Sequence, residues 1–107
     1  MYPNDRKIGF KIGWCAMLAQ QYDLAEEYMV ERLRGKNPNL EDYINYAHLC
    51  MIRGDRMSAY EYYREARRQA GSLKRWKVSY CPDRKMLIEH GVPTDQVYRI
   101  EGLMVSI

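Results

Sequence analysis

Few side chains in this chain of 107 residues could carry out catalysis or bind a metal, and their spacing does not suit either task. His48 and His90 lie far apart in the sequence, and Asp83 and Glu89 have no second carboxylate at a spacing suited to paired acid–base catalysis. Cys81 precedes a proline and an Asp-Arg pair, as an activated thiol could, but no glycine-rich phosphate loop follows it. No Cys/His pair has the spacing of zinc ligands. We therefore expect no enzyme, no catalytic residue, no metal and no cofactor.

A basic run with interleaved aromatic residues is the second group that could do chemistry. It consists of Arg64, Arg67, Arg68, Lys74, Arg75 and Lys77. Trp76 and Tyr80 add the rings that stack on bases, while the basic side chains could contact phosphates. On the other hand, Glu61 and Glu65 could pair with neighbouring arginines on an ordinary solvated helix face. Nucleic acid is the less favoured partner, and binding of a nucleic acid or an acidic partner through residues 64–77 is kept as the alternative function.

Composition and charge are those of one ordinary globular domain. Apolar residues make up 47% of the chain and charged residues 29%. Residues 53–85 carry ten Lys and Arg against four Asp and Glu, a net charge of +6, so the rest carries −3. No apolar run approaches the roughly 18 residues of a membrane span, and the first residues lack the apolar stretch of a secretory signal. Three cysteines without metal spacing favour a reducing compartment, so we expect a cytoplasmic protein with no membrane partner.

Apolar spacing, glycines and prolines predict a helical chain. Ser72–Tyr80 is predicted to be either an irregular helix or a loop. Thr94 is predicted to be the N-cap of the last helix, whose apolar residues Val97, Tyr98, Ile100 and Met104 would cover the end of the preceding helices. The predicted helices span approximately residues 4–19, 24–34, 40–53, 57–70, 83–90 and 94–105.

A 34-residue offset aligns the first third of the chain with the second. Residues 20–29 fall on residues 54–63, which places Ala25 on Ala59 and Tyr28 on Tyr62. A self-match at this period is typical of stacked helical hairpins, in which each unit buries its apolar face against its neighbours.

These residues resemble the tetratricopeptide repeat (TPR) family. The second unit, residues 40–73, matches the family pattern at Tyr43, Tyr46, Ala47, Gly54-Asp55, Ala59, Tyr62-Tyr63 and Ala66. The first unit, residues 6–39, matches it at Ile12, Gly13, Tyr22-Asp23, Ala25, Tyr28 and Asn37-Pro38. The pattern departs from the family at Gly9, Arg32 and Gly71. The resemblance implies an all-α fold of stacked antiparallel helical hairpins, a TPR-like right-handed α-solenoid segment with a C-terminal capping helix.

The same resemblance implies one domain over residues 1–107, with repeats at 6–39 and 40–73 and a helical cap at 74–107. Small residues are expected where two helices approach closely, at Gly13, Ala25, Ala47 and Ala59. Tyr28 and Tyr62 are expected to fill the wedge between hairpins, so that truncating Tyr62 would open a cavity. Pro3-Asn4-Asp5 stands where an upstream unit would close, so we expect the chain to be the C-terminal piece of a longer array.

In this family, the first helix of each hairpin lines a concave groove. The residues that fall on this groove are Lys7, Phe10, Trp14 and Met17 from the first helix and Glu41, Ile44, His48 and Met51 from the third. Phe10 and Trp14 stand where carboxylate-binding members need a Lys and an Asn, and of that clamp only Asn45 matches. The alternative is that the last helix or further repeats cover this stripe, which would make it core.

We therefore expect a non-enzymatic scaffold for protein–protein interaction. Its expected partner is an amphipathic helix or an extended apolar peptide, with Trp14 as the main contact. Homotypic association through an exposed end of the array is a further option.

Overall fold

The computed structural model describes residues 6–107, with side chains from residue 9 onward, and this part of the chain is helical throughout. Its radius of gyration is 13.2 Å, the value expected of a compact domain of this length. The helices are α1 (Arg6–Leu18), α2 (Tyr22–Arg34), α3 (Leu40–Ile52), α4 (Arg56–Ala70), α5 (Leu73–Tyr80), the 3₁₀ turn η1 (Cys81–Asp83), α6 (Arg84–Glu89) and α7 (Thr94–Val105).

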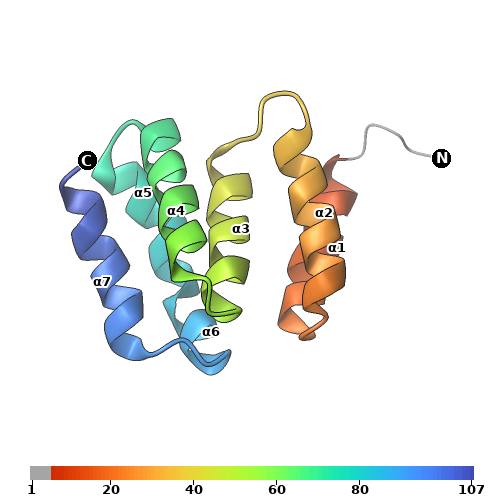
Figure 1. Ribbon diagram of the computed structural model, residues 1–107. Coiled ribbons are helices and arrows are strands. Elements are labelled where there is room, and N and C mark those ends of the chain that lie inside the picture. The colour runs from red at the N-terminus through yellow and green to blue at the C-terminus, as the bar shows by residue number, and fades with distance from the viewer. Residues whose placement is uncertain (1–5) are drawn as a thin grey trace.

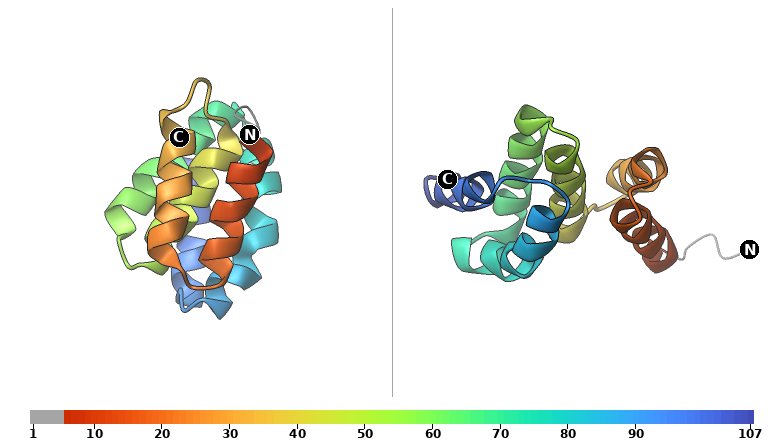
Figure 2. Two further views of the ribbon diagram at one scale, coloured as in Figure 1. Left: turned by 90° about the vertical axis from the view of Figure 1, so that its right-hand side faces the viewer. Right: turned by 90° about the horizontal axis from the view of Figure 1, so that it is seen from below.

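Each helix packs on the one that precedes it in the chain, as Figure 1 shows. The helices α1 and α2 form one antiparallel hairpin and α3 and α4 form the next, with α2 lying against α3. The helix α5 then packs on both α3 and α4, and α7 lies on the outer side of α4 (Figure 2). The expected all-α class is therefore confirmed, and the last helix packs on α4, α5 and α6.

Several backbone features of the two hairpins recur at the 34-residue offset. The helix α4 begins 34 residues after α2. Left-handed backbone occurs at Gln20 (φ 63°) and Gly54 (φ 86°), and again at Asn37 (φ 58°) and Gly71 (φ 78°). The same turn hydrogen bond recurs as well. The amide of Gln21 donates to the carbonyl of Ala16 at 2.8 Å, and the amide of Asp55 donates to the carbonyl of Cys50 at 2.9 Å. The turns after α1 and α3 therefore share their backbone geometry even where the residue types differ.

Side-chain caps explain where several helices begin. Asn39 and Asp42 form a capping box at the start of α3, in which each side chain accepts a hydrogen bond from the other's backbone amide. The Ser72 side chain accepts a hydrogen bond from the amide of Arg75 and caps α5. The segment predicted to be an irregular helix or a loop is therefore a regular, capped helix. The prediction for Thr94 is wrong by one position, because Pro93 occupies the N-cap and no side chain caps α7.

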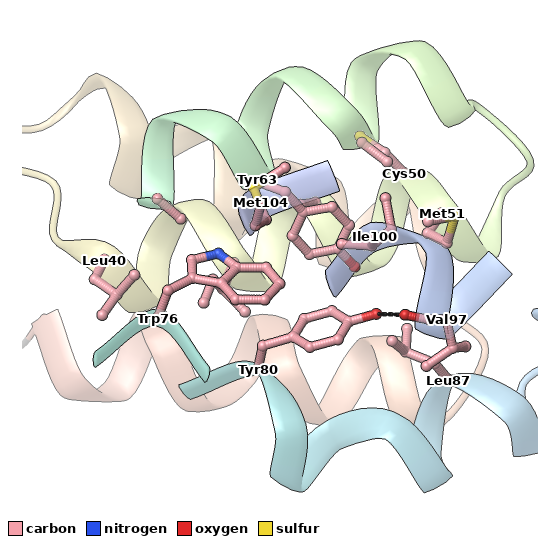
Figure 3. Close-up of a cluster of buried hydrophobic side chains, with 14 of the residues drawn as sticks. Leu40, Cys50, Met51, Tyr63, Trp76, Tyr80, Leu87, Val97, Ile100 and Met104 are labelled. Carbon is pink, nitrogen blue, oxygen red and sulfur yellow. Dashed lines mark hydrogen bonds between the residues drawn. The ribbon is translucent and has the colours of Figure 1, made fainter. Parts of the chain in front are cut away.

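The buried apolar residues form two clusters. The larger one joins α3, α4, α5, α6 and α7, and its centre is the group of rings in Figure 3. There Trp76 stacks on Tyr80 with 4.5 Å between ring centroids, and Tyr63 meets Tyr80 edge-on at 5.4 Å. The Tyr80 hydroxyl donates to the Val97 carbonyl at 2.7 Å. The smaller cluster ties α1 and α2 to α3 and consists of Ala16, Met17, Ala25, Met29 and Leu49.

Three expectations about aromatic residues need correction. Trp76 and Tyr80 were assigned to the basic surface, but both are fully buried, because α5 turns its apolar side toward α3 and α4. The cavity-filling tyrosine of α4 is Tyr63, which is fully buried, whereas Tyr62 is half-buried and meets Tyr46 edge-on at 4.8 Å. On α7, Tyr98 is 52% exposed rather than packed inward.

The close approach of paired helices at small residues is confirmed. Ala25, Ala47 and Ala59 are fully buried. A Cβ added at Gly13 would lie 3.3 Å from Cγ of Met29 on α2, tighter than an ordinary contact.

Replacing Ala59 by leucine should lower the free energy of unfolding by about 1–3 kcal/mol, because the added atoms must displace well-packed neighbours. Urea unfolding followed by circular dichroism measures this change. Met57→Leu, which changes an 80% exposed side chain on the same helix, is the control and should unfold like the parent. An Ala59→Leu variant with parental stability would contradict the close approach of α3 and α4.

Candidate functional site

A pocket of about 340 Å³ opens between α1, α3 and the segment formed by α5 and η1. Its apolar walls come from Phe10 and Trp14 on α1, Ile44 on α3 and Val78 on α5, and Val78 is 68% exposed. The polar lining residues are Glu41, Asn45, Ser79 and Asp83. Apolar walls with a few convergent polar groups are the usual make-up of a binding pocket.

The structure divides the predicted groove residues into two sets. Phe10, Trp14, Glu41 and Ile44 line this pocket together. Met17, His48 and Met51 are buried in the helix packing instead, because α2, α4, α5 and η1 cover that part of the stripe. The side chain of Lys7 lies outside the described side chains.

Sequence reasoning missed the side of the pocket that α5 and η1 form. Val78, Ser79 and Asp83 belong to the segment whose helical register was left open, so their faces could not be assigned. The sequence did contain one signal, because Val78 is an apolar residue within the basic run. The buried Trp76 and Tyr80 show that this run forms an amphipathic helix.

A chain of hydrogen bonds runs from the core to the pocket wall. Nδ1 of the fully buried His48 lies 2.6 Å from the Tyr63 hydroxyl, and its Nε2 lies 3.0 Å from Oδ2 of Asp83. An ionised carboxylate only accepts, so Nε2–H donates to Asp83, and Nδ1 of the neutral ring then accepts from the Tyr63 hydroxyl. The Asp83 side chain is 23% exposed and lines the pocket. The bond from His48, on the core side, therefore holds this carboxylate in one orientation.

A second buried polar group supports the α1 side of the pocket. Arg32 on α2 pairs with the carboxylate of Asp42, whose side chain is fully buried, and its guanidinium lies 5.2 Å from the centroid of the Phe10 ring. Arg32 was noted as a departure from the family pattern. Here it joins the first hairpin to the start of α3 and holds a ring of the pocket wall.

The polar side chains of the pocket retain unused hydrogen-bonding capacity. Asn45 is 7% exposed, and its side-chain amide has no hydrogen-bond partner among the described residues. Within the same part of the chain, Glu41 is exposed and forms no ion pair. Both residues line the pocket, so their polar atoms are open to a hydrogen-bonding ligand.

The basic run is divided between intramolecular contacts and open surface. Arg64 lies 5.5 Å from the Tyr60 ring centroid, Arg68 pairs with Glu65 at 2.8 Å, and Arg67 donates to the Met104 and Ile107 carbonyls at the end of the chain. The exposed members are Arg68 on α4 and Lys74, Arg75 and Lys77 on α5. Since Trp76 and Tyr80 are buried, neither ring is available to stack on a base.

The thiol considered for chemistry is held by two charged side chains. Cys81 lies between Arg84 and Glu101, with Sγ 3.1 Å from Nη2 of Arg84 and 3.4 Å from Oε1 of Glu101. Burial and the Glu101 carboxylate raise the pKa of the Cys81 thiol, which makes it a poor nucleophile. Over residues 6–107, no group of three or more His, Cys, Asp and Glu side chains is placed to hold a metal ion.

Alkaline pH should destabilise this protein through its buried phenols and thiol. Burial raises the pKa of Cys50 from 9.0 to about 11 and that of Tyr46 from 10.0 to about 12, and it raises the pKa of Tyr63 well above 10.0. Between the unfolded and folded pKa values the unfolded chain releases protons that the folded chain keeps. Stability is therefore complete below about pH 9 and is lost as the pH rises toward 11 and 12.

The urea midpoint should accordingly be lower at about pH 10.5 than at about pH 8, conditions on either side of the unfolded thiol and phenol pKa values. A Cys50→Ala variant should lose less of its midpoint over this interval than the parent. Equal midpoints at the two pH values would contradict the burial of these groups.

Together these features define a small all-helical domain with sequential helix packing and one pocket shared by α1, α3, α5 and η1. No protein-family model, no curated protein and no solved structure matches the chain. No helix in the described part of the chain combines the length and the apolar character that crossing a membrane requires.

Proposed function

We propose that this chain is a TPR-like helical-repeat domain that binds a peptide segment of another protein in the pocket between α1, α3 and α5. The repeat assignment is supported by the 34-residue recurrence of a helix start, left-handed turn residues and turn hydrogen bonds in the two hairpins. It is also supported by the buried small residues at equivalent positions, such as Ala25 and Ala59.

The observation that carries the binding function is the composition and position of the pocket. The helices α1 and α3 occupy equivalent places in the two hairpins, and the pocket lies where the resemblance puts the concave groove. Phe10, Trp14 and Val78 offer apolar surface that the fold leaves partly open. A volume of about 340 Å³ suits one or two inserted side chains better than a whole folded surface.

Trp14→Ala should weaken peptide binding by about 30-fold or more, because a central aromatic contact contributes about 2 kcal/mol when truncated. The probe is a phage-displayed library of random dodecapeptides, from which the parent protein selects binders whose Kd is then measured by fluorescence anisotropy. Tyr98→Ala is the matched control, since it removes an exposed aromatic ring on α7, away from the pocket.

Equal affinity of the parent and Trp14→Ala for the selected peptides would place binding elsewhere on the protein and contradict the proposal. Loss of affinity on Tyr98→Ala to the same extent would do so as well. Circular dichroism of both variants must match that of the parent, because Trp14 also contacts the smaller hydrophobic cluster.

A further inference from the structure

We propose that the pocket selects a peptide that places a Lys or Arg side chain beside its apolar residue. This inference rests on the proposed peptide-binding function and adds the charge of the partner. It assigns Glu41 and Asp83 as the groups that determine specificity.

The charged side chains that the structure describes in the pocket lining have one sign. Glu41 on α3 and Asp83 on η1 are both acidic, and the described lining residues include no Lys or Arg. The other walls are the apolar side chains of Phe10, Trp14 and Ile44, which lower the local dielectric and strengthen the field of the two carboxylates. An anionic ligand would meet repulsion here, whereas an ammonium or guanidinium group would meet two carboxylates.

The aromatic wall suits the same cation. A guanidinium or ammonium group is attracted to the face of a Trp or Phe ring, and the attraction grows as water is excluded. The protein already uses this interaction on the Phe10 ring, over which Arg32 lies at 5.2 Å. Trp14 is half-buried and has no cation over its ring among the described residues.

The carboxylate of Asp83 is oriented before any ligand arrives. Its Oδ2 accepts from Nε2 of His48, and His48 is itself held by the Tyr63 hydroxyl in the core. No described group bonds to Oδ1 of Asp83. A fixed carboxylate loses little conformational freedom on binding, which favours affinity and directional recognition.

Asn45 supplies a second, independent sign of a ligand. The residue as a whole is 7% exposed and lines the same pocket, and its side chain forms no hydrogen bond with another described residue. A peptide that brings a cation to Glu41 and Asp83 also brings polar atoms within reach of this amide, which would satisfy a group that otherwise stays without a hydrogen bond.

The test uses the full chain and the same random dodecapeptide library at physiological salt. Peptides selected by the parent should be enriched in Lys or Arg next to a large apolar residue, relative to the starting library. Replacing the selected Arg by citrulline, which keeps the shape and removes the charge, should weaken binding to the parent by about tenfold, or about 1.4 kcal/mol.

The double variant Glu41→Gln/Asp83→Asn should bind the Arg and citrulline peptides equally. The Asn carbonyl oxygen at position 83 can still accept from His48, so the fold should be kept. The control Glu89→Gln/Asp95→Asn makes the same change in net charge at two exposed residues that do not line the pocket, and it should keep the tenfold preference.

The outcomes separate this inference from the function on which it rests. Selected peptides without basic enrichment that still lose affinity on Trp14→Ala would support the peptide pocket and overturn the cation preference. A basic preference that persists in Glu41→Gln/Asp83→Asn would overturn the assignment of these two residues. Selection of no peptide above the Trp14→Ala background would overturn both proposals.

Discussion

Tyr63→Ala should lower the free energy of unfolding by about 3–5 kcal/mol, which is a large part of the stability of a domain of this size. The ring is fully buried and contacts the rings of Trp76 and Tyr80 edge-on, at 6.2 Å and 5.4 Å between centroids. Its removal leaves a cavity in the centre of the larger cluster and takes away the hydroxyl that His48 faces at 2.6 Å. Urea unfolding at neutral pH, followed by circular dichroism, measures the loss.

Two matched variants divide the effect into its parts. Tyr63→Phe removes only the hydroxyl and leaves a buried imidazole nitrogen without its partner, so it should cost about 1–3 kcal/mol. Tyr62→Ala truncates the neighbouring tyrosine, which is half-buried against Tyr43 and Tyr46, and should cost less than Tyr63→Ala. If Tyr62→Ala were the more damaging of the two, the position of α4 in the structure would be wrong.

Asp42→Ala should destabilise the protein by about 3–5 kcal/mol, because one member of a buried ion pair is removed. The Asp42 side chain is fully buried and pairs with Arg32, whose side chain is 13% exposed. The same carboxylate accepts from the backbone amide of Asn39, so the capping box of α3 is lost too. Thermal and urea unfolding should both show the decrease.

A surface pair provides the comparison for this variant. Glu65→Ala removes the partner of Arg68, whose side chain is 56% exposed, and should change stability by less than about 1 kcal/mol. Added salt should leave the Asp42 effect nearly unchanged, since a buried pair is poorly screened. An Asp42→Ala variant as stable as Glu65→Ala would show that the Arg32 pair does not hold the first hairpin to α3.

Local rules were sufficient to predict most of the helices. The stop at Gly71, which is left-handed, and the start of α3 after the Asn37-Pro38 break lie where glycine and proline chemistry places them, while α2 ends at the predicted Gly35 in an extended conformation open to any residue. The N-cap of α7 was predicted one residue too late, at Thr94, because Pro93 takes that position with an extended backbone (ψ 141°), whereas the helix itself spans the predicted residues 94–105. Here the expectation failed at the scale of a single residue.

Only half of the pocket could be predicted from the sequence, because the helical register of the segment that forms α5 and η1 was not known. Helical spacing on α1 and α3 brought Phe10, Trp14 and Ile44 to one face, and the structure places all three in the pocket. Val78 and Asp83 could not be assigned, since their direction depends on how α5 docks on α3 and α4. The bond from His48 to Asp83 likewise joins residues 35 apart in sequence, a relation that no local pattern contains.

The two hydrophobic clusters lie on different sides of the pocket, and this affects how the pocket can open. One wall belongs to the smaller cluster of α1 and α2, and the opposite wall belongs to α5 and η1 of the larger one. The smaller cluster has few fully buried residues, and it meets the larger one at Tyr46, Ile52 and Met86, so the first hairpin should exchange its amide hydrogens faster than α3 and α4 do. A bound peptide would contact both walls of the pocket, and its binding energy would slow the opening of the first hairpin.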